Sequence, residues 1–234
     1  MLIGGLDVET TGLSPKEDEI TELGMVIWDS ELDAPVWMES IFRKDCKKKI
    51  SPQITELTGI TRDLLDDYGR PDDYIQEKVT EFSNAVQFYM AHNAKFDRGF
   101  MDNKFKMVNK PWVCSVKDIE YPESFKTKSL GPLAAYHGFI NPWPHRALTD
   151  VLTMFKVASN YNFHEILANA RLPKVTLECK ISYDQRHLPK EAGFYWDSGK
   201  KIWFKEMRKD KATELVKTLG FLVNIVDPTE EVPF

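Results

Sequence analysis

Apolar runs rich in β-branched and aromatic residues, separated by turn residues, dominate the beginning of the chain. Three of these runs predict a meander of strands at 3–8, 21–29 and 36–42. From Pro52 the spacing becomes helical, with Thr61 capping one helix and Pro71 opening another. One more strand and three helices are then expected, at 86–91, 95–108, 129–137 and from His145 to about Asn160. Mixed strands with helices on both faces predict an α/β fold.

The pattern changes near Pro173, which interrupts the chain after a helix expected at 163–170. The order expected beyond it is strand, helix, two strands, helix and strand, at 175–182, 184–193, 194–196, 201–207, 210–220 and 221–225. This order is that of a ferredoxin-like unit. We therefore predict a first domain over 1–165, a linker over 166–174 and a small α+β domain over 175–234.

The two middle strands of the second domain are aromatic and flank a turn signal, Asp197-Ser198-Gly199-Lys200, which predicts a hairpin. We expect one face to carry Phe194, Trp196, Ile202 and Phe204, and the other to carry Tyr195, Trp203 and Lys205. Two interpretations stay open. Either one set is core and the other is ordinary surface, or the exposed rings stack on nucleic-acid bases while nearby lysines contact phosphates.

Composition narrows the classes of function. With 234 residues and 42% hydrophobic content, the chain can build one large or two small cores. A net charge of −5 excludes a broadly cationic nucleic-acid coat but not local basic patches. The three cysteines lie far apart without a ligand motif, which indicates reduced thiols. No apolar stretch reaches about 18 residues and no leader pattern is seen, so we expect a cytoplasmic protein without membrane contact.

Two carboxylates, Asp7 and Glu9, stand two residues apart within the first predicted strand. Side chains at i and i+2 of a strand point to the same face, so these anions lie side by side in an apolar setting. That arrangement is costly unless a cation lies between them. Asp29 and Glu31 have the same spacing but follow the end of a strand, where we interpret them as a solvated turn. The first pair therefore predicts a divalent metal site.

The pattern His-x-x-x-x-Asp occurs twice, as His92/Asp97 and His145/Asp150. Five residues turn a helix by about 500°, so the two side chains would diverge by about 140° if both were helical. We therefore expect each histidine on a loop and each aspartate in the first turns of a helix. A loop histidine suits a mobile base beside a fixed ligand, so His145 is predicted as the general base. His92, at a strand end, is interpreted as a structural residue.

Four carboxylates and one histidine could together form a metal-dependent hydrolytic site. Oxygen ligands without paired cysteines suit Mg²⁺ or Mn²⁺ rather than zinc. Two such ions roughly 3.5–4 Å apart can activate a water and stabilise the leaving oxygen of a phosphodiester. A neutral histidine can accept the proton of that water. The implied reaction is phosphodiester hydrolysis.

Three segments resemble the motifs of the DEDDh exonucleases, a DnaQ-like family with a ribonuclease-H-like fold: LDVETTGL (6–13), AHNAKFD (91–97) and HRALTD (145–150). Within that family the chain is most similar to the exodeoxyribonuclease X type. The likeness covers residue 1 to about residue 165, with the motifs in the family's order. One departure is Thr58, where many members have histidine, and it removes no catalytic group.

The resemblance implies a role for each matching residue. Asp7 would be shared by two metal ions, Glu9 and Asp150 would hold the nucleophile-side ion, and Asp97 would serve the second. His145 would be the base. For the substrate, the resemblance implies contacts from Thr10, Leu13 and Asn93. It also implies cleavage from the 3′ end with release of mononucleotides.

Three functions stay open at this point. The first is a metal-dependent 3′→5′ exonuclease acting on DNA, and the second is an RNA-trimming exonuclease with the same site. The third is a non-catalytic module that binds nucleic-acid ends or a polymerase, against which the complete catalytic set argues. A polymerase or repair partner, the preferred strandedness and the oligomeric state are not fixed by these residues.

Overall fold

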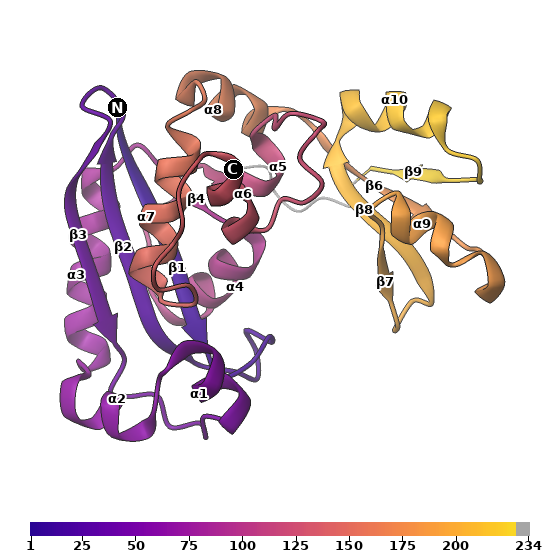
Figure 1. The fold of residues 1–234 in the computed structure, drawn as a ribbon. Coiled ribbons are helices and arrows are strands. Elements are labelled where there is room, and N and C mark those ends of the chain that lie inside the picture. Colours follow the sequence, from indigo (N-terminus) through magenta and orange to yellow (C-terminus); the bar gives the residue numbers. More distant parts are fainter. Residues whose placement is uncertain (228–234) are drawn as a thin grey trace. The chain divides into compact units, whose positions relative to one another are not determined.

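The computed structural model describes residues 1–227, which form two compact units divided after Ala170 (Figure 1). The first unit contains a five-stranded sheet in the order β3-β2-β1-β4-β5. Its strands are β1 (Leu2–Thr10), β2 (Ile20–Asp29), β3 (Ala34–Phe42), β4 (Phe88–Ala91) and β5 (Trp112–Cys114). The first three strands pair antiparallel, and β4 and β5 continue the sheet in parallel from β1. The predicted meander and α/β class are confirmed.

Between residues 1 and 171 of the described chain, eight helices surround this sheet. They are α1 (Pro52–Thr58), α2 (Arg62–Tyr68), α3 (Asp72–Ala85), α4 (Lys95–Lys104), α5 (Ser115–Asp118), α6 (Leu130–Tyr136), α7 (Ala147–Ala158) and α8 (Phe163–Arg171). The predicted starts of two helices are confirmed, since Thr61 caps α2 through the Leu64 amide and α3 begins directly after Pro71. Helix α4 ends earlier than predicted because Phe105 is extended and buried. The short β5 and α5 were not predicted.

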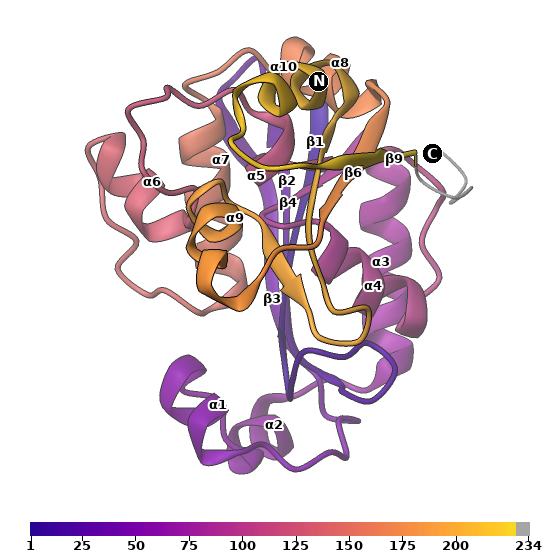
Figure 2. The same ribbon diagram turned by 90° about the vertical axis from the view of Figure 1, so that its right-hand side faces the viewer.

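Helices α3 and α7 cover opposite faces of the sheet, which both perpendicular views show (Figures 1 and 2). Separate apolar clusters fill the two sides, one around Phe82 and Phe100 and the other around Phe155 and Met90. Tyr89 and Trp112 belong to the first cluster, where their rings lie 5.1 Å apart. With both faces covered in this way, β2 and β4 are buried along almost their whole length.

Two glycines allow α7 to lie directly against β1 and β2. A Cβ added at Gly5 would lie 2.3 Å from the Phe155 ring, and one at Gly24 would lie 2.4 Å from the Ala147 carbonyl carbon. Such distances are too short for any other residue type without movement of the helix. The close approach brings the first turns of α7 to the strands that carry the predicted carboxylates.

The second unit is a four-stranded antiparallel sheet in the order β7-β8-β6-β9. Its elements are β6 (Lys174–Cys179), η1 (Tyr183–Gln185), α9 (His187–Glu191), β7 (Tyr195–Asp197), β8 (Ile202–Arg208), α10 (Lys209–Thr218) and β9 (Asn224–Val226). The predicted order β-α-β-β-α-β is therefore present. Both helices lie on one side of this sheet (Figure 2), where Val175, Leu177 and Cys179 form its core.

The predicted faces of the hairpin are wrong. Trp196 lies opposite Trp203, and Tyr195 lies opposite Phe204. Directly opposed residues of an antiparallel pair share a face. Trp203 thus belongs with Trp196 on the helix-covered side, and Phe204 belongs with Tyr195 on the other side. The pairing of Asp197 with Ile202 sets this register, which sequence alternation within each strand cannot supply.

Boundaries near the second unit also differ from the prediction. The expected linker 166–174 holds the end of α8 and the first residue of β6, so only Leu172 and Pro173 separate the two elements. The last strand begins at Asn224 instead of Phe221, whose ring packs on Phe194 in the core. Residues 228–234 of the predicted second domain lie outside the described residues. Within the described chain, no helix combines the length and apolarity needed to cross a membrane.

Candidate active site

Three of the predicted carboxylates converge where β1 and α7 meet. Carboxylate oxygens of Asp7, Glu9 and Asp150 all lie within 4.8 Å of one another. Asp7 and Glu9 project from one face of β1, and Asp150 comes from the first turn of α7. All three side chains are partly buried. The two strand residues and the helix residue, distant in the sequence, are thus brought into one acidic cluster.

The fourth carboxylate, Asp97, is buried in the first turn of α4. Its Oδ1 accepts a hydrogen bond of 3.2 Å from the backbone N–H of Val8, the residue between Asp7 and Glu9. This contact fixes α4 against the strand that carries the pair. Asp97 also raises the pKa of Asp7 by charge repulsion, so the two side chains share one electrostatic environment.

Asp150 is held by a loop that precedes α7. Its Oδ1 accepts from the Asn141 amide at 2.5 Å, and its Oδ2 accepts from the backbone N–H of His145 at 3.2 Å. The Asn141 side chain also accepts from the N–H of Trp143. The same loop therefore positions the predicted ligand and presents the predicted base. Sequence analysis did not identify Asn141, which carries no distinctive local pattern.

A fifth carboxylate, Glu22, lies on β2 directly opposite Glu9 and is fully buried. Arg146 donates to both of its oxygens at 3.0 Å, and Ser40 and the Ala147 amide also donate to it. Glu22 therefore ties β2 to the beginning of α7. Sequence analysis missed this pair. The available signal in the sequence was the charged residue Glu22 near the start of a mostly apolar strand.

The acidic side chains repel one another in the absence of a cation. Burial, followed by the charges of Asp97, Glu9 and Asp150, raises the pKa of Asp7 well above its usual range. Burial, then Asp150, raises the pKa of Glu9 to about 8. Burial raises the pKa of Asp97 to about 7 and also raises the pKa of Asp150. A cluster of buried carboxylates that protonate this readily is expected of groups that bind a cation.

The residues fit a divalent metal ion. They offer several carboxylate oxygens from two rigid elements, with further hydrogen bonds that orient Asp97 and Asp150. Hard oxygen ligands of this kind suit Mg²⁺ or Mn²⁺. Second-layer contacts to the ligands are typical of functional metal sites. Three of the four metal ligands predicted from the sequence, Asp7, Glu9 and Asp150, are thus close enough to act together, and Asp97 is bonded to the strand that carries two of them.

The two histidines occupy very different surroundings. His145 is exposed on the loop before α7 and has a left-handed backbone, with φ of 61°. His92 is partly buried after β4, where its Nδ1 lies 2.7 Å from the Ser115 hydroxyl. Burial lowers the pKa of His92 to about 4. Both histidines thus lie outside helices, as predicted, with His145 exposed and His92 in contact with Ser115.

The predicted substrate residues lie on turns that follow the catalytic strands. Thr10 is buried at the end of β1, and its hydroxyl donates to the Gly12 carbonyl. Leu13 is 84% exposed at the tip of the next turn. Asn93 is exposed between β4 and α4 and has a φ of 75°. Leu13 and Asn93 are thus exposed on loops, whereas Thr10 is a buried residue at the end of its strand.

The turn that carries Leu13 is held by Asp18. This carboxylate accepts from the Ser14 amide at 3.0 Å and from the Lys48 ammonium at 2.6 Å, which lowers its pKa. A Cβ at Gly12 would lie 2.4 Å from the Asp18 carboxylate, so a larger residue there would displace this side chain from the turn. Lys48 thus stabilises the turn from outside, and the backbone amides of Lys47 and Lys48 both donate to Glu19.

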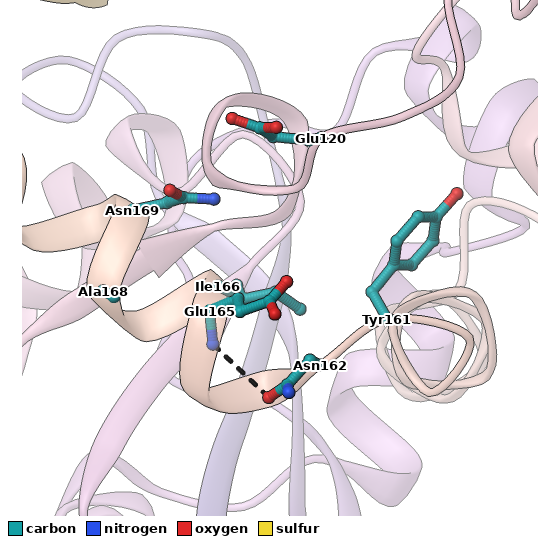
Figure 3. A pocket seen from close by; sticks show the side chains of 7 residues that line it. All are labelled: Glu120, Tyr161, Asn162, Glu165, Ile166, Ala168 and Asn169. Carbon is teal, nitrogen blue, oxygen red and sulfur yellow. Dashed lines mark hydrogen bonds between the residues drawn. The ribbon is translucent and has the colours of Figure 1, made fainter.

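A separate hollow lies beside α8 (Figure 3) and has a volume of about 290 Å³. Its lining residues are Glu120, Tyr161, Asn162, Glu165, Ile166, Ala168 and Asn169. Asn162 uses its side chain to accept from the amides at the start of α8, including that of Glu165. None of these residues belongs to the acidic cluster, so this hollow and the candidate active site are distinct.

Comparison with known families divides the chain in the same way as the structure. A family model described as exonuclease matches residues 5–158, which include all five predicted catalytic residues. A second model, described as a domain of unknown function, matches residues 175–226.

The curated relatives include large DNA polymerases. DNA polymerase III of the PolC type from Staphylococcus haemolyticus is 36% identical over 154 residues, and that from Clostridium perfringens is 37% identical over 153 residues. Each alignment covers 62% of this chain and 10% of the polymerase. The chain thus spans about a tenth of the length of these relatives.

Solved structures share the fold of the first unit. Exonuclease X in complex with 5′ overhanging duplex DNA has a TM-score of 0.54 at 20% identity, and the match covers 72% of this chain and 99% of that one. The nuclease domain of 3′hExo, a DEDDh family member bound to rAMP, has a TM-score of 0.57 at 18% identity, with 68% and 90% covered. The predicted ribonuclease-H-like exonuclease fold is confirmed.

Proposed function

Because this chain belongs to the exonuclease family, we propose that it hydrolyses phosphodiester bonds from the 3′ end of DNA and releases nucleoside monophosphates. The observation that carries the proposal is the convergence of Asp7, Glu9 and Asp150 within 4.8 Å, with Asp97 bound to the backbone between the first two. A purely structural role would not require four carboxylates whose charges repel one another.

The carboxylates supply the metal-binding part of the mechanism. Asp7, Glu9, Asp97 and Asp150 are proposed to hold two Mg²⁺ or Mn²⁺ ions. When bound, these ions lower the pKa of a coordinated water and stabilise the leaving oxygen. Asn141 and the His145 amide keep Asp150 in one orientation, because both of its oxygens accept hydrogen bonds from the preceding loop. The protein thereby fixes its ligands before substrate arrives.

The loop and turn residues supply the base and the substrate contacts. His145 accepts the proton of the attacking water at a ring nitrogen, for which its exposed position leaves room. Leu13 packs against the terminal base from its turn, and the Thr10 backbone and Asn93 position the terminal nucleotide. Histidine is the side chain that most often acts as a general base in enzymes.

DNA is the favoured substrate because the matching segment of the curated relatives lies within DNA polymerases. That likeness also supports an association with DNA synthesis or repair. RNA trimming by the same site is the alternative, since the carboxylates and the histidine act on the phosphodiester rather than on the sugar.

The proposal is tested with 5′-labelled single- and double-stranded DNA and RNA incubated with the full chain in Mg²⁺, Mn²⁺ or EDTA. A ladder that shortens from the 3′ end of DNA in either metal, and not in EDTA, is the expected result. If RNA were shortened faster than DNA, the preferred substrate would be RNA, and the proposed hydrolysis from the 3′ end would stand. Absence of shortening on every substrate, or equal shortening by Asp150→Asn, would overturn the proposal.

A further inference from the structure

The β7–β8 hairpin of the second unit, residues 194–205, carries exposed rings on both faces. Tyr195 is 70% exposed and Trp196 is 50% exposed. Because the two are adjacent on a strand, their side chains point to opposite sides of the sheet. The edge strand β7 therefore presents one large aromatic ring to solvent on each of its faces.

Each exposed ring is supported by a second ring on β8. The Tyr195 and Phe204 centroids lie 6.2 Å apart, and those of Trp196 and Trp203 lie 5.5 Å apart. Trp203 in turn packs against the core of the unit. The outer rings are therefore held by neighbours in fixed cross-strand positions. A supported ring loses little conformational freedom when a ligand stacks on it.

The charge of the hairpin is positive. Between Phe194 and Lys205 the only acidic residue is Asp197, against three lysines. The Asp197 carboxylate accepts from the Gly199 and Lys200 amides at 2.9 Å, so it is occupied in closing the turn. Lys200 and Lys201 are exposed at that turn, next to the rings.

The rest of the same sheet limits where an anion can lie. On the face of Tyr195 and Phe204, Glu178 lies opposite Phe204 and Glu206 lies opposite Thr176. These carboxylates on the neighbouring strands repel phosphates. The favourable region is therefore the hairpin itself, where rings and lysines are combined.

From this combination we propose that the β7–β8 hairpin binds single-stranded nucleic acid. At the edge strand β7, one base stacks on Tyr195 on one face and another stacks on Trp196 on the opposite face, while Lys200 and Lys201 at the turn contact phosphates. Stacking on aromatic rings beside a basic groove is how proteins bind single strands without sequence preference. A duplex does not offer the faces of its bases in this way. The proposal deepens the exonuclease function proposed above, on which it rests, by assigning a strand-binding surface to the second unit.

The test measures the affinity of the full chain for a fluorescein-labelled oligothymidylate in EDTA, where hydrolysis is blocked. Tyr195→Ala and Trp196→Ala should each weaken binding roughly 5- to 150-fold, the range expected for one stacked base. Tyr195→Phe should retain affinity because it keeps the ring. Leu222→Ala, which removes an exposed apolar side chain elsewhere in the unit, is the matched control and should change nothing.

The lysines are tested through salt dependence. Lys200→Gln with Lys201→Gln should reduce the slope of log affinity against log salt by about 1.4, or roughly 0.7 for each lost phosphate contact. Lys217→Gln, on α10 and paired with Glu214, is the control and should leave the slope unchanged. The turn variants also guard against misfolding, because their side chains are exposed and removing them leaves no cavity.

These measurements distinguish a failure of the strand-binding proposal from a failure of the proposed exonuclease function. Wild-type affinity in both ring variants and an unchanged slope in the lysine variant would overturn the strand-binding proposal, and would point to a protein partner for the rings. Melting temperatures of all variants should match that of the wild type, and a large fall would assign the rings to the core. Hydrolysis by the wild type in Mg²⁺ reports on the exonuclease function alone.

Discussion

At the scale of single residues, the proposed metal site consists of carboxylates that repel one another until a cation binds. We expect Asp7→Asn and Asp150→Asn to abolish hydrolysis. Because each removes one anion from a repulsive cluster, metal-free thermal stability should be retained or rise. Activity assays with Mg²⁺ and melting curves in EDTA check both parts. More than a small residual turnover in either variant would contradict the metal-ligand assignment.

The two histidines provide an internal comparison, since both belong to the same sequence pattern. His145→Ala should lower turnover by roughly 10²–10⁴-fold, the usual contribution of a general base, with little change in metal affinity. His92→Ala should reduce turnover far less but lower stability, because it loses the contact with Ser115. Single-turnover rates and metal titrations on both variants decide the matter. An active His145 variant together with an inactive His92 variant would reverse the assignment.

At the scale of the elements, Glu22 and Arg146 join β2 to the start of α7. The Glu22 side chain is 1% exposed and that of Arg146 is 37% exposed, so the ion pair is only partly screened by water. Glu22→Gln should lower the free energy of unfolding by about 1–3 kcal/mol, less than a fully buried pair would lose. Turnover should fall roughly 10-fold or more, because Asp150 moves with α7.

A matched control for that pair is Arg98→Gln, which breaks an exposed ion pair with Asp102 on α4. It should change stability by less than about 1 kcal/mol, as is usual for surface pairs. Urea unfolding and turnover measured on both variants provide the comparison. If Glu22→Gln behaved like the surface control in both measurements, Glu22 would not position the helix.

Whether a contact could be predicted from the sequence depends on how far apart its residues are along the chain. Asp7 and Glu9 could be paired because strand periodicity is local. The contact between Glu22 and Arg146 joins residues 124 positions apart, and no periodicity encodes it. The prediction of the hairpin's faces was wrong for a related reason. Alternation shows which residues of one strand share a face, but not which residues of the two strands lie opposite each other. The short β5 is set by its neighbour β4 rather than by its own three residues.

At the scale of the whole molecule, the acidic cluster links stability to pH and to metal. The pKa of Glu9 is raised to about 8 and that of Asp97 to about 7. The folded chain therefore holds protons that the unfolded chain releases near pH 4. Since the folded state binds more protons across this range, metal-free stability should fall as the pH rises from about 4 to about 8.

Melting curves of the first unit in EDTA and in Mg²⁺, at about pH 5 and about pH 8, test this linkage. Without metal, the melting temperature should be lower at the higher pH. Mg²⁺ should raise it most at that pH, where the carboxylates are ionised and available as ligands. Asp7→Asn should flatten both responses. A metal-free protein that is more stable at the higher pH, with no effect of Asp7→Asn, would contradict the proposed electrostatics.

The two units have separate cores, with one sheet flanked by α3 and α7 and the other packed against α9 and α10. All predicted catalytic residues belong to the first unit, and the proposed strand-binding hairpin belongs to the second. Under the two proposals, the first unit carries the chemistry and the second binds the strand.

The most direct measurement of the central claim is mass spectrometry of the products that the full chain releases from single-stranded DNA in Mg²⁺ and heavy-oxygen water. The account predicts nucleoside 5′-monophosphates, removed in order from the 3′ end, each carrying one solvent oxygen on phosphorus. It also predicts no products from Asp150→Asn. Internal fragments, 3′-phosphates, or equal release by that variant would contradict hydrolysis at the acidic cluster.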